Sequence, residues 1–176
     1  MSKWIIDSDH SVGAFSIGHL MVARVHGQLN KVSGIVLFDP ADMTSLSVEL
    51  EIGVSGIMTG IPKRDDHLRS PDFFDVAIYP VISFKSLKAE RTGFSSCKVN
   101  GDLTIHGITK PISIEVTVSG PVNSPFGETS IGLTGRTVID REDFGLTWNQ
   151  PLENNGLMVG KDVEISMNIE ADLTDK

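Results

Sequence analysis

The amino-acid sequence predicts an all-β fold of about eight antiparallel strands and two short helices. The first observation is a strict alternation of apolar and polar residues in three segments, 46–54, 112–118 and 162–171. Successive side chains of a strand point to opposite faces, so each of these segments has one dry face and one wet face. Strands covered by helices on both faces would show continuous apolar runs instead. The second observation is that residues typical of turns separate the segments.

The other elements follow from the same two signals. His106-Gly107 predicts a tight hairpin between Ile105 and Ile108, and Asp39-Pro40 closes the strand that precedes it. The segment 121–127, which is rich in Pro, Asn, Ser and Gly, predicts a loop. Helices are predicted only at 17–23 and 63–70, the second of them ended by Pro71. Further strands are predicted at 10–17, 25–39, 80–89, 96–105 and 129–140.

Two architectures bury the dry faces of about eight strands, a two-sheet sandwich and a closed barrel. Closure removes the sheet edges that promote aggregation. The segment 25–39 taken as one strand spans roughly 50 Å at ~3.3 Å per residue. Long strands and only 6% aromatic residues favour a barrel with an elongated lumen. With 176 residues, the chain has the size of one domain, which we expect to span 1–176.

Composition excludes several classes of protein. With 15 Lys and Arg against 23 Asp and Glu, the net charge is −8, which repels phosphate backbones and argues against nucleic acid as a partner. Cys97 is the only cysteine, so an intrachain disulfide and a Cys-rich zinc site are excluded, and we interpret it as a small buried side chain. The chain lacks a long apolar run and a secretory h-region. We therefore expect no membrane span and a cytoplasmic location, or a periplasmic or secreted one if a leader was removed.

Motifs of catalysis and metal binding are absent from the sequence. It contains no GxSxG elbow, no P-loop and no GxGxxG fingerprint. The five histidines lack the spacing of a zinc-binding helix, so we expect them to make structural hydrogen bonds. Adjacent carboxylates, as at Asp65-Asp66 and Glu142-Asp143, usually diverge and do not act as an acid–base pair. No catalytic residue and no metal ligand is predicted.

Five segments, in order from about residue 4 to residue 170, resemble the YceI-like family, whose members bind polyisoprenoids. They are Trp4–Leu20, Phe38–Pro40, Arg64–Phe84, Gly101–Pro111 and Arg141–Trp148. The resemblance implies a lipocalin-like, extended eight-stranded antiparallel barrel. It also implies that the lumen holds an isoprenoid chain, such as a quinone tail or a polyprenyl phosphate. Relatives often form dimers, so a homodimer is a further expectation.

We expect the ligand to contact apolar residues near the predicted helices and the last motif, and polar residues at the mouth of the barrel. The apolar candidates are Phe15, Ile17, Leu20, Met21, Phe73, Phe74, Phe84, Leu103, Phe144 and Trp148. The polar candidates are His19, Arg64 and His67. Arg64, His67 and the neighbouring Arg69 could bind a phosphate or a quinone carbonyl, because Arg and His donate hydrogen bonds to such oxygens. For the apolar residues the alternative is plain core packing. For Arg64 it is an ion pair with Asp65 that holds the short helix against the barrel.

Burial of an isoprenoid chain is favourable by ~0.8 kcal/mol per CH₂, or about 16 kcal/mol gross for roughly twenty carbons. The loss of freedom on association and the ordering of side chains cost several kcal/mol of this free energy. The remainder suffices for binding, so we expect no charged anchor and no cofactor beyond the bound lipid. We therefore predict non-catalytic binding, transport or sequestration of a long apolar lipid in the lumen. Two alternatives are a small hydrolase or isomerase that acts on an apolar substrate inside the barrel, and a structural or interaction barrel without ligand.

Overall fold

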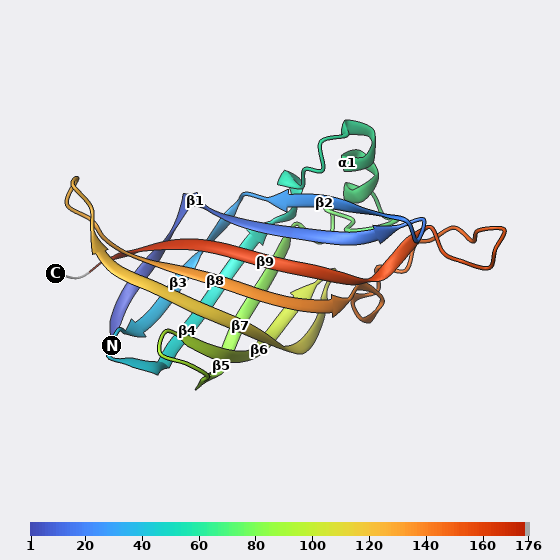
Figure 1. The fold of residues 1–176 in the computed structure, drawn as a ribbon. Coiled ribbons are helices and arrows are strands. Elements are labelled where there is room, and N and C mark those ends of the chain that lie inside the picture. The colour runs from blue at the N-terminus through green and yellow to red at the C-terminus, as the bar shows by residue number, and fades with distance from the viewer. Residues whose placement is uncertain (175–176) are drawn as a thin grey trace.

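The computed structural model describes residues 1–174, which form one antiparallel sheet that closes into a barrel (Figure 1). The sheet order is β2-β1-β3-β4-β5-β6-β7-β8-β9, and the pairing of β1 with β9 closes it. Eight strands, β1 and β3 to β9, make the ring, and β2 extends along β1 beyond the end of β3. The strands are β1 (Ser2–His19), β2 (Ala23–Leu29), β3 (Val32–Asp39), β4 (Asp42–Gly53), β5 (Val81–Arg91), β6 (Ser96–Ile105), β7 (Ile108–Asn123), β8 (Thr129–Asp140) and β9 (Val159–Leu173). The predicted all-β, eight-stranded barrel is confirmed.

The alternation of the sequence becomes the inside and outside of the barrel. Along β6 every second residue, from Cys97 to Ile105, is buried, and the residues between them are partly exposed. The hairpin between β6 and β7 has the predicted two-residue turn, in which His106 has a φ of 52° and Gly107 a φ of 73°. Two positive φ angles match the twist of the flanking strands.

The segment 25–39 is two strands, and its prediction as one 15-residue strand is wrong. β2 pairs with β1 from Gly13 to His19, whereas β3 pairs with β1 from Ser2 to Ile5. Between these two regions the register of β1 with β9 shifts, from Asp7 to Val12. An irregularity of this kind bends a strand, so one straight partner cannot follow both parts of β1.

Of the two predicted helices, one forms. α1 (Pro62–Arg69) has Pro at its first position and ends before Pro71, as the prediction for 63–70 requires. The predicted helix at 17–23 is wrong, because Ile17 pairs with both Val25 and Val163 and thus continues β1. Two short 3₁₀ helices complete the described chain, η1 (Val54–Gly56) and η2 (Arg141–Phe144).

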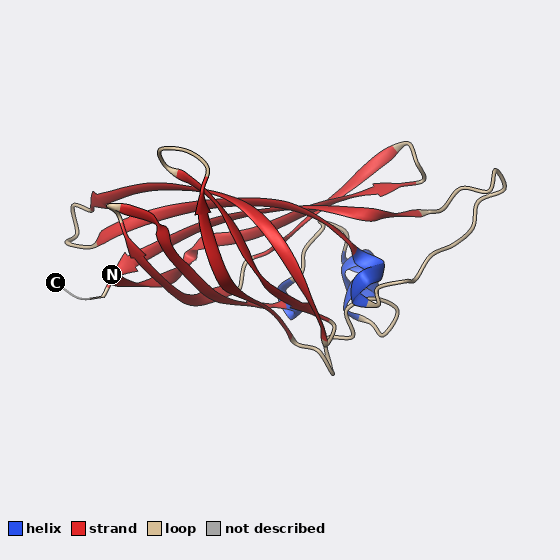
Figure 2. Ribbon diagram, turned by 90° about the horizontal axis from the view of Figure 1, so that it is seen from below, coloured by secondary structure: helices blue, strands red, loops and turns tan. Residues whose placement is uncertain are grey.

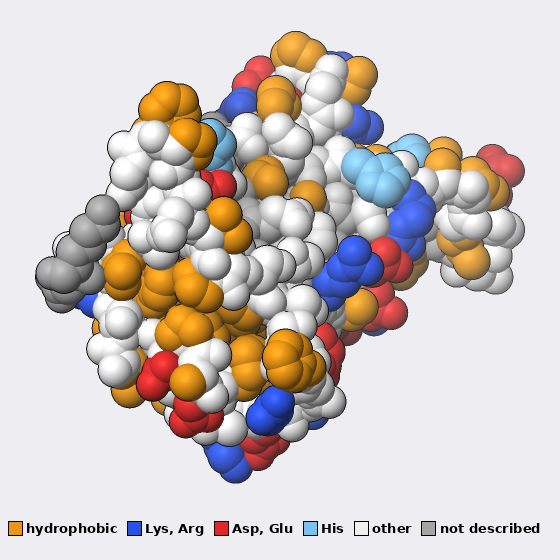
Figure 3. Space-filling model, turned by 60° about the vertical axis from the view of Figure 1, so that its left-hand side comes forward, with side chains coloured by type: hydrophobic (Ala, Val, Ile, Leu, Met, Phe, Trp, Pro, Cys, Tyr) orange, Lys and Arg blue, Asp and Glu red, His pale blue; other side chains and the backbone are white. Residues whose placement is uncertain are grey.

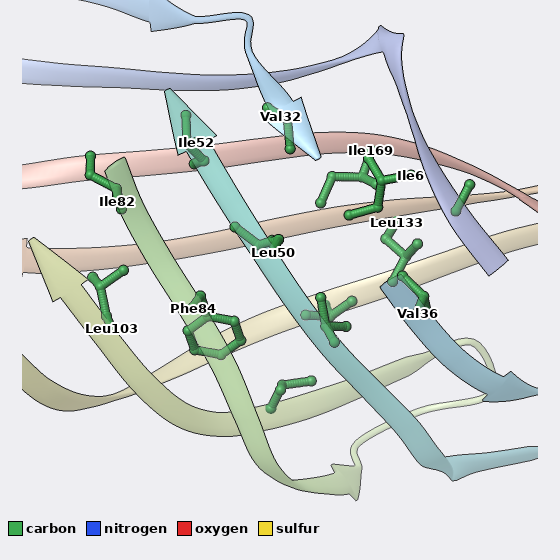
Figure 4. Packing of buried hydrophobic residues seen from close by; sticks show 14 of the residues in the cluster. Ile6, Val32, Val36, Leu50, Ile52, Ile82, Phe84, Leu103, Leu133 and Ile169 are labelled. Atoms are coloured by element: carbon green, nitrogen blue, oxygen red, sulfur yellow. The ribbon is translucent and has the colours of Figure 1, made fainter. Parts of the chain in front are cut away.

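The hydrophobic core fills one half of the barrel, which we call the closed half, and its buried side chains continue along the wall of the other half. Trp4, Phe38, Cys97 and Ile131 lie there, each no more than 2% exposed, and the indole Nε1 of Trp4 donates a hydrogen bond to the carbonyl oxygen of Phe38 at 3.3 Å. The interpretation of Cys97 as a buried side chain is confirmed. Figure 4 shows side chains from several strands pointing toward one another inside the barrel.

The two ends of the barrel differ in what covers them. α1 lies at the end where β4 finishes and β5 begins, and the long segment between β8 and β9 extends beyond it (Figure 2). Figure 3 brings the opposite end forward and shows hydrophobic side chains gathered on the surface near the C-terminus. In residues 1–174 no helix has the length and hydropathy needed to cross a membrane.

Candidate ligand cavity

The half of the barrel under α1 holds a cavity of about 300 Å³, and we call it the cavity half. Its wall comes from the inward faces of β1, β2 and β4 to β9, and its cap from α1 and the segments that follow α1 and β8. Most of the lining side chains are aliphatic or aromatic. The volume is at the lower end of the range for small-molecule sites, which are concave and mostly apolar.

Strand β9 passes from one half to the other without a change of pattern. Its inward residues Val163, Ile165 and Met167 line the cavity and are only partly buried, whereas Ile169 and Ala171 are buried in the closed half. All five side chains are apolar and point to the same side of the sheet. The cavity therefore arises where facing side chains fail to meet, and not where the strand becomes polar.

Two aromatic side chains of the wall lie flat against neighbouring strands because glycine leaves room for them. A Cβ on Gly101 would come within 2.7 Å of the Phe84 ring, and one on Gly27 would overlap the Phe15 ring. Phe84 pairs with Leu103 across β5 and β6, and Phe15 pairs with Gly27 across β1 and β2. The glycines thereby keep both rings at the wall, where they line the lumen without filling it.

Three rings close the mouth of the cavity below α1. The His67 ring stands edge-on to Phe73 and Trp148, with centroid distances of 5.0 and 4.8 Å, and Phe73 lies 5.3 Å from Trp148. His67 Nε2 is 2.8 Å from a carboxylate oxygen of Asp72, which orients the ring. A residue from α1, one from the turn after it and one from the segment after β8 thus form a single aromatic cover.

The predicted phosphate-binding role of Arg64 competes with bonds that it already makes to Thr59, in the loop before α1. Its Nε donates to Thr59 Oγ1 at 2.7 Å and its Nη2 to the Thr59 carbonyl oxygen at 2.9 Å. The buried Asp65 carboxylate accepts from the amide and the hydroxyl of the same Thr59. Arg69 donates to the carbonyl oxygens of Ser55 and Ile57. These bonds fasten α1 to the segment 55–59 that precedes it, without the expected ion pair between Arg64 and Asp65.

Arg141 is the one buried cation at the cavity among residues 1–174, and sequence reasoning missed it. It is 3% exposed and lines the lumen at the start of η2. Its Nε donates to the Gly160 carbonyl oxygen at 2.7 Å and its Nη1 to that of Leu146, whereas its Nη2 has no partner within the described chain. Burial lowers the pKa of its guanidinium. A signal existed, because the inward positions of β8 continue in steps of two from Ile131 to residue 141.

Ten of the thirteen predicted ligand contacts lie on the cavity wall or cap. They are Phe15, Ile17, His19, Arg64, His67, Phe73, Phe74, Phe84, Leu103 and Trp148. The other three do not line the cavity. Leu20 and Met21 have positive φ in the turn after β1 and are 37% and 73% exposed, and Phe144 is 1% exposed in the core cluster. Leu20 and Met21 were predicted as ligand contacts because a helix was expected at 17–23. Phe144 was predicted because the last motif gave no sign of the 3₁₀ helix η2. Contact of the ten with a ligand stays a prediction.

A group able to hold a metal lies outside the barrel, away from the cavity. The ligand atoms of Asp7, His10 and Glu170 lie within 4.8 Å of one another. His10 Nδ1 is 2.6 Å from an Asp7 carboxylate oxygen, and this hydrogen bond raises the pKa of His10 and lowers that of Asp7. His10 and Asp7 are thus hydrogen-bonded to each other where the register of β1 with β9 shifts. This bond is of the structural kind expected for the histidines.

Fold and cavity define a class of protein, the closed antiparallel β-barrel with an internal apolar cavity. Within that class, the family model described as a YceI-like domain matches residues 4–171, and the chain belongs to the YceI-like family.

Relatives and solved structures agree with this assignment. A UPF0312 protein of Staphylococcus aureus is 35% identical over 176 residues, which cover 99% of this chain and all of that protein. A UPF0312 protein of Pseudomonas savastanoi is 35% identical over 147 residues, or 82% of this chain and 77% of its own. The crystal structure of the Campylobacter jejuni YceI protein has a TM-score of 0.76 at 27% identity and covers 90% of both chains.

Two further structures share the fold at lower identity. Burkholderia cenocepacia BcnA has a TM-score of 0.81 at 24% identity, over 94% of this chain and 98% of its own. A domain from Saccharophagus degradans described as polyisoprenoid-binding has a TM-score of 0.73 at 15% identity, over 98% of this chain and 99% of its own.

Proposed function

We propose that this protein binds one long apolar lipid, of the polyisoprenoid type, in the cavity half and thereby carries or sequesters it. The observation that carries the proposal is an apolar cavity inside a barrel whose other half is filled by buried hydrophobic side chains. Membership of the YceI-like family supports it, as does the likeness of fold to a domain described as polyisoprenoid-binding.

The wall favours a flexible chain over a rigid or polar molecule. Aliphatic side chains from β7 and β9, such as Ile114, Ile165 and Met167, face the lumen together with the Phe15 and Phe84 rings. Each CH₂ that moves from water to such a wall contributes about 0.8 kcal/mol. Met167 has rotatable bonds that adapt to a ligand of irregular outline.

Binding explains the polar residues at the mouth better than catalysis does. General acid–base work needs a side chain within hydrogen-bond reach of the substrate. His67 packs edge-on to Phe73 and Trp148, and Arg64 is bonded to Thr59, so both help to hold the cap in place. The same cap borders the mouth, and we expect it to move when a lipid enters. Cytoplasmic location and a homodimer remain predictions.

Native mass spectrometry of the freshly purified protein, followed by solvent extraction, tests the proposal. We expect a bound mass that fragments as an isoprenoid, or uptake of an added isoprenoid lipid by the emptied protein. Replacing Ile165 by Trp should fill the cavity and lower occupancy at least about tenfold, since the ring takes the volume of the ligand chain. The matched control is Val138→Trp on the outer face of β8, where the side chain is 60% exposed. A folded wild-type protein that carries no lipid and takes up none would refute the proposal.

A further inference from the structure

We propose that Arg141 is an internal anchor for an anionic oxygen head group, so that the preferred ligand is an isoprenoid with a terminal phosphate or a comparable oxyanion. This inference rests on the proposed lipid-binding function and extends it from the chain of the ligand to its head. It moves the polar recognition site from α1, where sequence reasoning placed it, to the end of β8.

The first argument is the hydrogen bonding of the guanidinium. Nε and Nη1 are bonded to the backbone carbonyl oxygens of Gly160 and Leu146, and these two bonds fix the plane of the group. Nη2 is the one buried side-chain nitrogen or oxygen in the described chain that lacks a hydrogen-bond partner. A buried donor without an acceptor costs free energy. Arg141 lines the cavity while its Nη2 is covered by neighbouring atoms, so a ligand oxygen that displaces this cover would supply the acceptor.

The second argument is charge. Only 3% of the Arg141 surface is exposed, and the side chain forms no ion pair with a carboxylate of the described residues. The two acidic neighbours in sequence are engaged elsewhere. Asp140 accepts a hydrogen bond from the amide of Glu142 at 2.8 Å, and the Glu142 carboxylate pairs with Lys161 at 2.9 Å. Coulomb attraction from Glu142 and Asp140 opposes the effect of burial on the pKa of Arg141, but burial is the larger effect, so a ligand with a negative charge gains more than a neutral one.

The third argument is that the other cations near the mouth are already used. Arg64 is bonded to Thr59, and Arg69 is bonded to Ser55, Ile57 and Asp66. Arg141 is thus the arginine at the cavity whose unpaired donor is buried. Because its planar group is already oriented by the backbone, little further ordering is needed when the ligand binds.

Two lipids with the same chain, geranylgeranyl phosphate and geranylgeraniol, separate the head group from the chain. We expect wild-type protein to bind the phosphate about ten- to a hundredfold more tightly, which is the range for a hydrogen bond to a charged group. Arg141→Gln should remove most of this preference while the affinity for geranylgeraniol changes less than about threefold. Arg136→Gln, the same change on the outer face of β8, is the matched control and should keep the preference.

The outcomes separate this inference from the proposed function. Binding of neither lipid by folded wild-type protein would refute the lipid-binding function itself. Equal binding of both lipids, or a preference that survives in Arg141→Gln, would overturn the role of Arg141 and leave the lipid-binding function intact. If Arg141→Gln fails to fold, Arg141→Lys takes its place. That change keeps the charge and loses the planar fork, and we expect a reduced preference, whereas an undiminished preference would overturn the role.

Discussion

The two halves of the barrel are built from the same strands with the same apolar alternation, yet one is solid and the other hollow. Along β7 the inward residues Ile112 and Ile114 are partly accessible from the lumen, and Val116 and Val118, two steps further on, are buried. β9 makes the same transition between Met167 and Ile169. Hydrophobicity therefore decides which face points inward, and large side chains from opposite strands decide whether the interior is filled.

Filling is concentrated at the closed end, where two large aromatic side chains are buried. Trp4 and Phe38, both 2% exposed, come from adjacent strands and are joined by a hydrogen bond from the indole to the backbone. In the cavity half, by contrast, Phe15 and Phe84 are held against glycines at the wall. The closed half thus supplies stability and the cavity half supplies space, and this division can be tested residue by residue.

The largest expected effect is on stability, from a matched pair of truncations on one strand. Ile169→Ala should lower the free energy of unfolding by about 2–5 kcal/mol, because it opens a cavity in packed surroundings. Ile165→Ala should cost less than half as much, because that side chain already borders empty space. Urea denaturation of lipid-free protein measures both values. Equal losses would mean that the two halves are packed alike.

An intermediate effect is expected on the reactivity of thiols placed in the two halves. Cys97 is fully buried, and burial raises the pKa of its thiol, with a smaller contribution from Glu115. Because the thiolate is the reactive form, Cys97 should react with a maleimide at least about tenfold more slowly than a cysteine at position 163 in a Cys97→Ala background. Rates are followed by mass spectrometry. Added lipid should slow the reaction of Val163→Cys and leave that of Cys97 unchanged, and a fast-reacting Cys97 would show that the closed half opens.

The smallest effect concerns the pair of Asp7 and His10, on the outside of the barrel. The hydrogen bond to Asp7 comes first among the causes that raise the pKa of His10 above its usual 6.5. A raised folded-state pKa of His10 means that the contribution of its charged form to stability is complete below about pH 6.5 and disappears as the pH rises through the raised value. The lowered pKa of Asp7 means that the contribution of its carboxylate is complete above about pH 3.8 and is lost as the pH falls through the lowered value. Asp7→Asn should lower the pKa of His10 in an NMR titration. Lipid affinity should stay unchanged. A change in affinity would show that the pair of Asp7 and His10 is energetically coupled to the cavity.

Much of the fold could be predicted because it depends on local signals. Alternation located the strands, and His106-Gly107 located a hairpin whose φ angles match that turn. Pro71 located the end of α1 within one residue, since a proline restricts the residue before it. The family resemblance then selected a barrel over a sandwich, which strand patterns alone leave open.

Other features depended on partners far apart in the chain. The break between β2 and β3 follows from the bend of β1 against β9, more than a hundred residues away. Leu20 and Met21 lie outside the cavity because strand pairing carries β1 through Ile17 to His19. No local pattern contains either fact.

By itself, the sequence determined which residues form strands, which side of each strand faces inward, and that the interior is apolar, because a strand's own periodicity encodes these properties. Only the tertiary structure decided where that interior stays empty and which polar atom borders the empty space. The volume of a cavity and the hydrogen bonds of a buried group depend on residues from opposite walls of the barrel. Arg141 became a candidate anchor only because closure of the barrel buried its Nη2 beside the cavity without an acceptor.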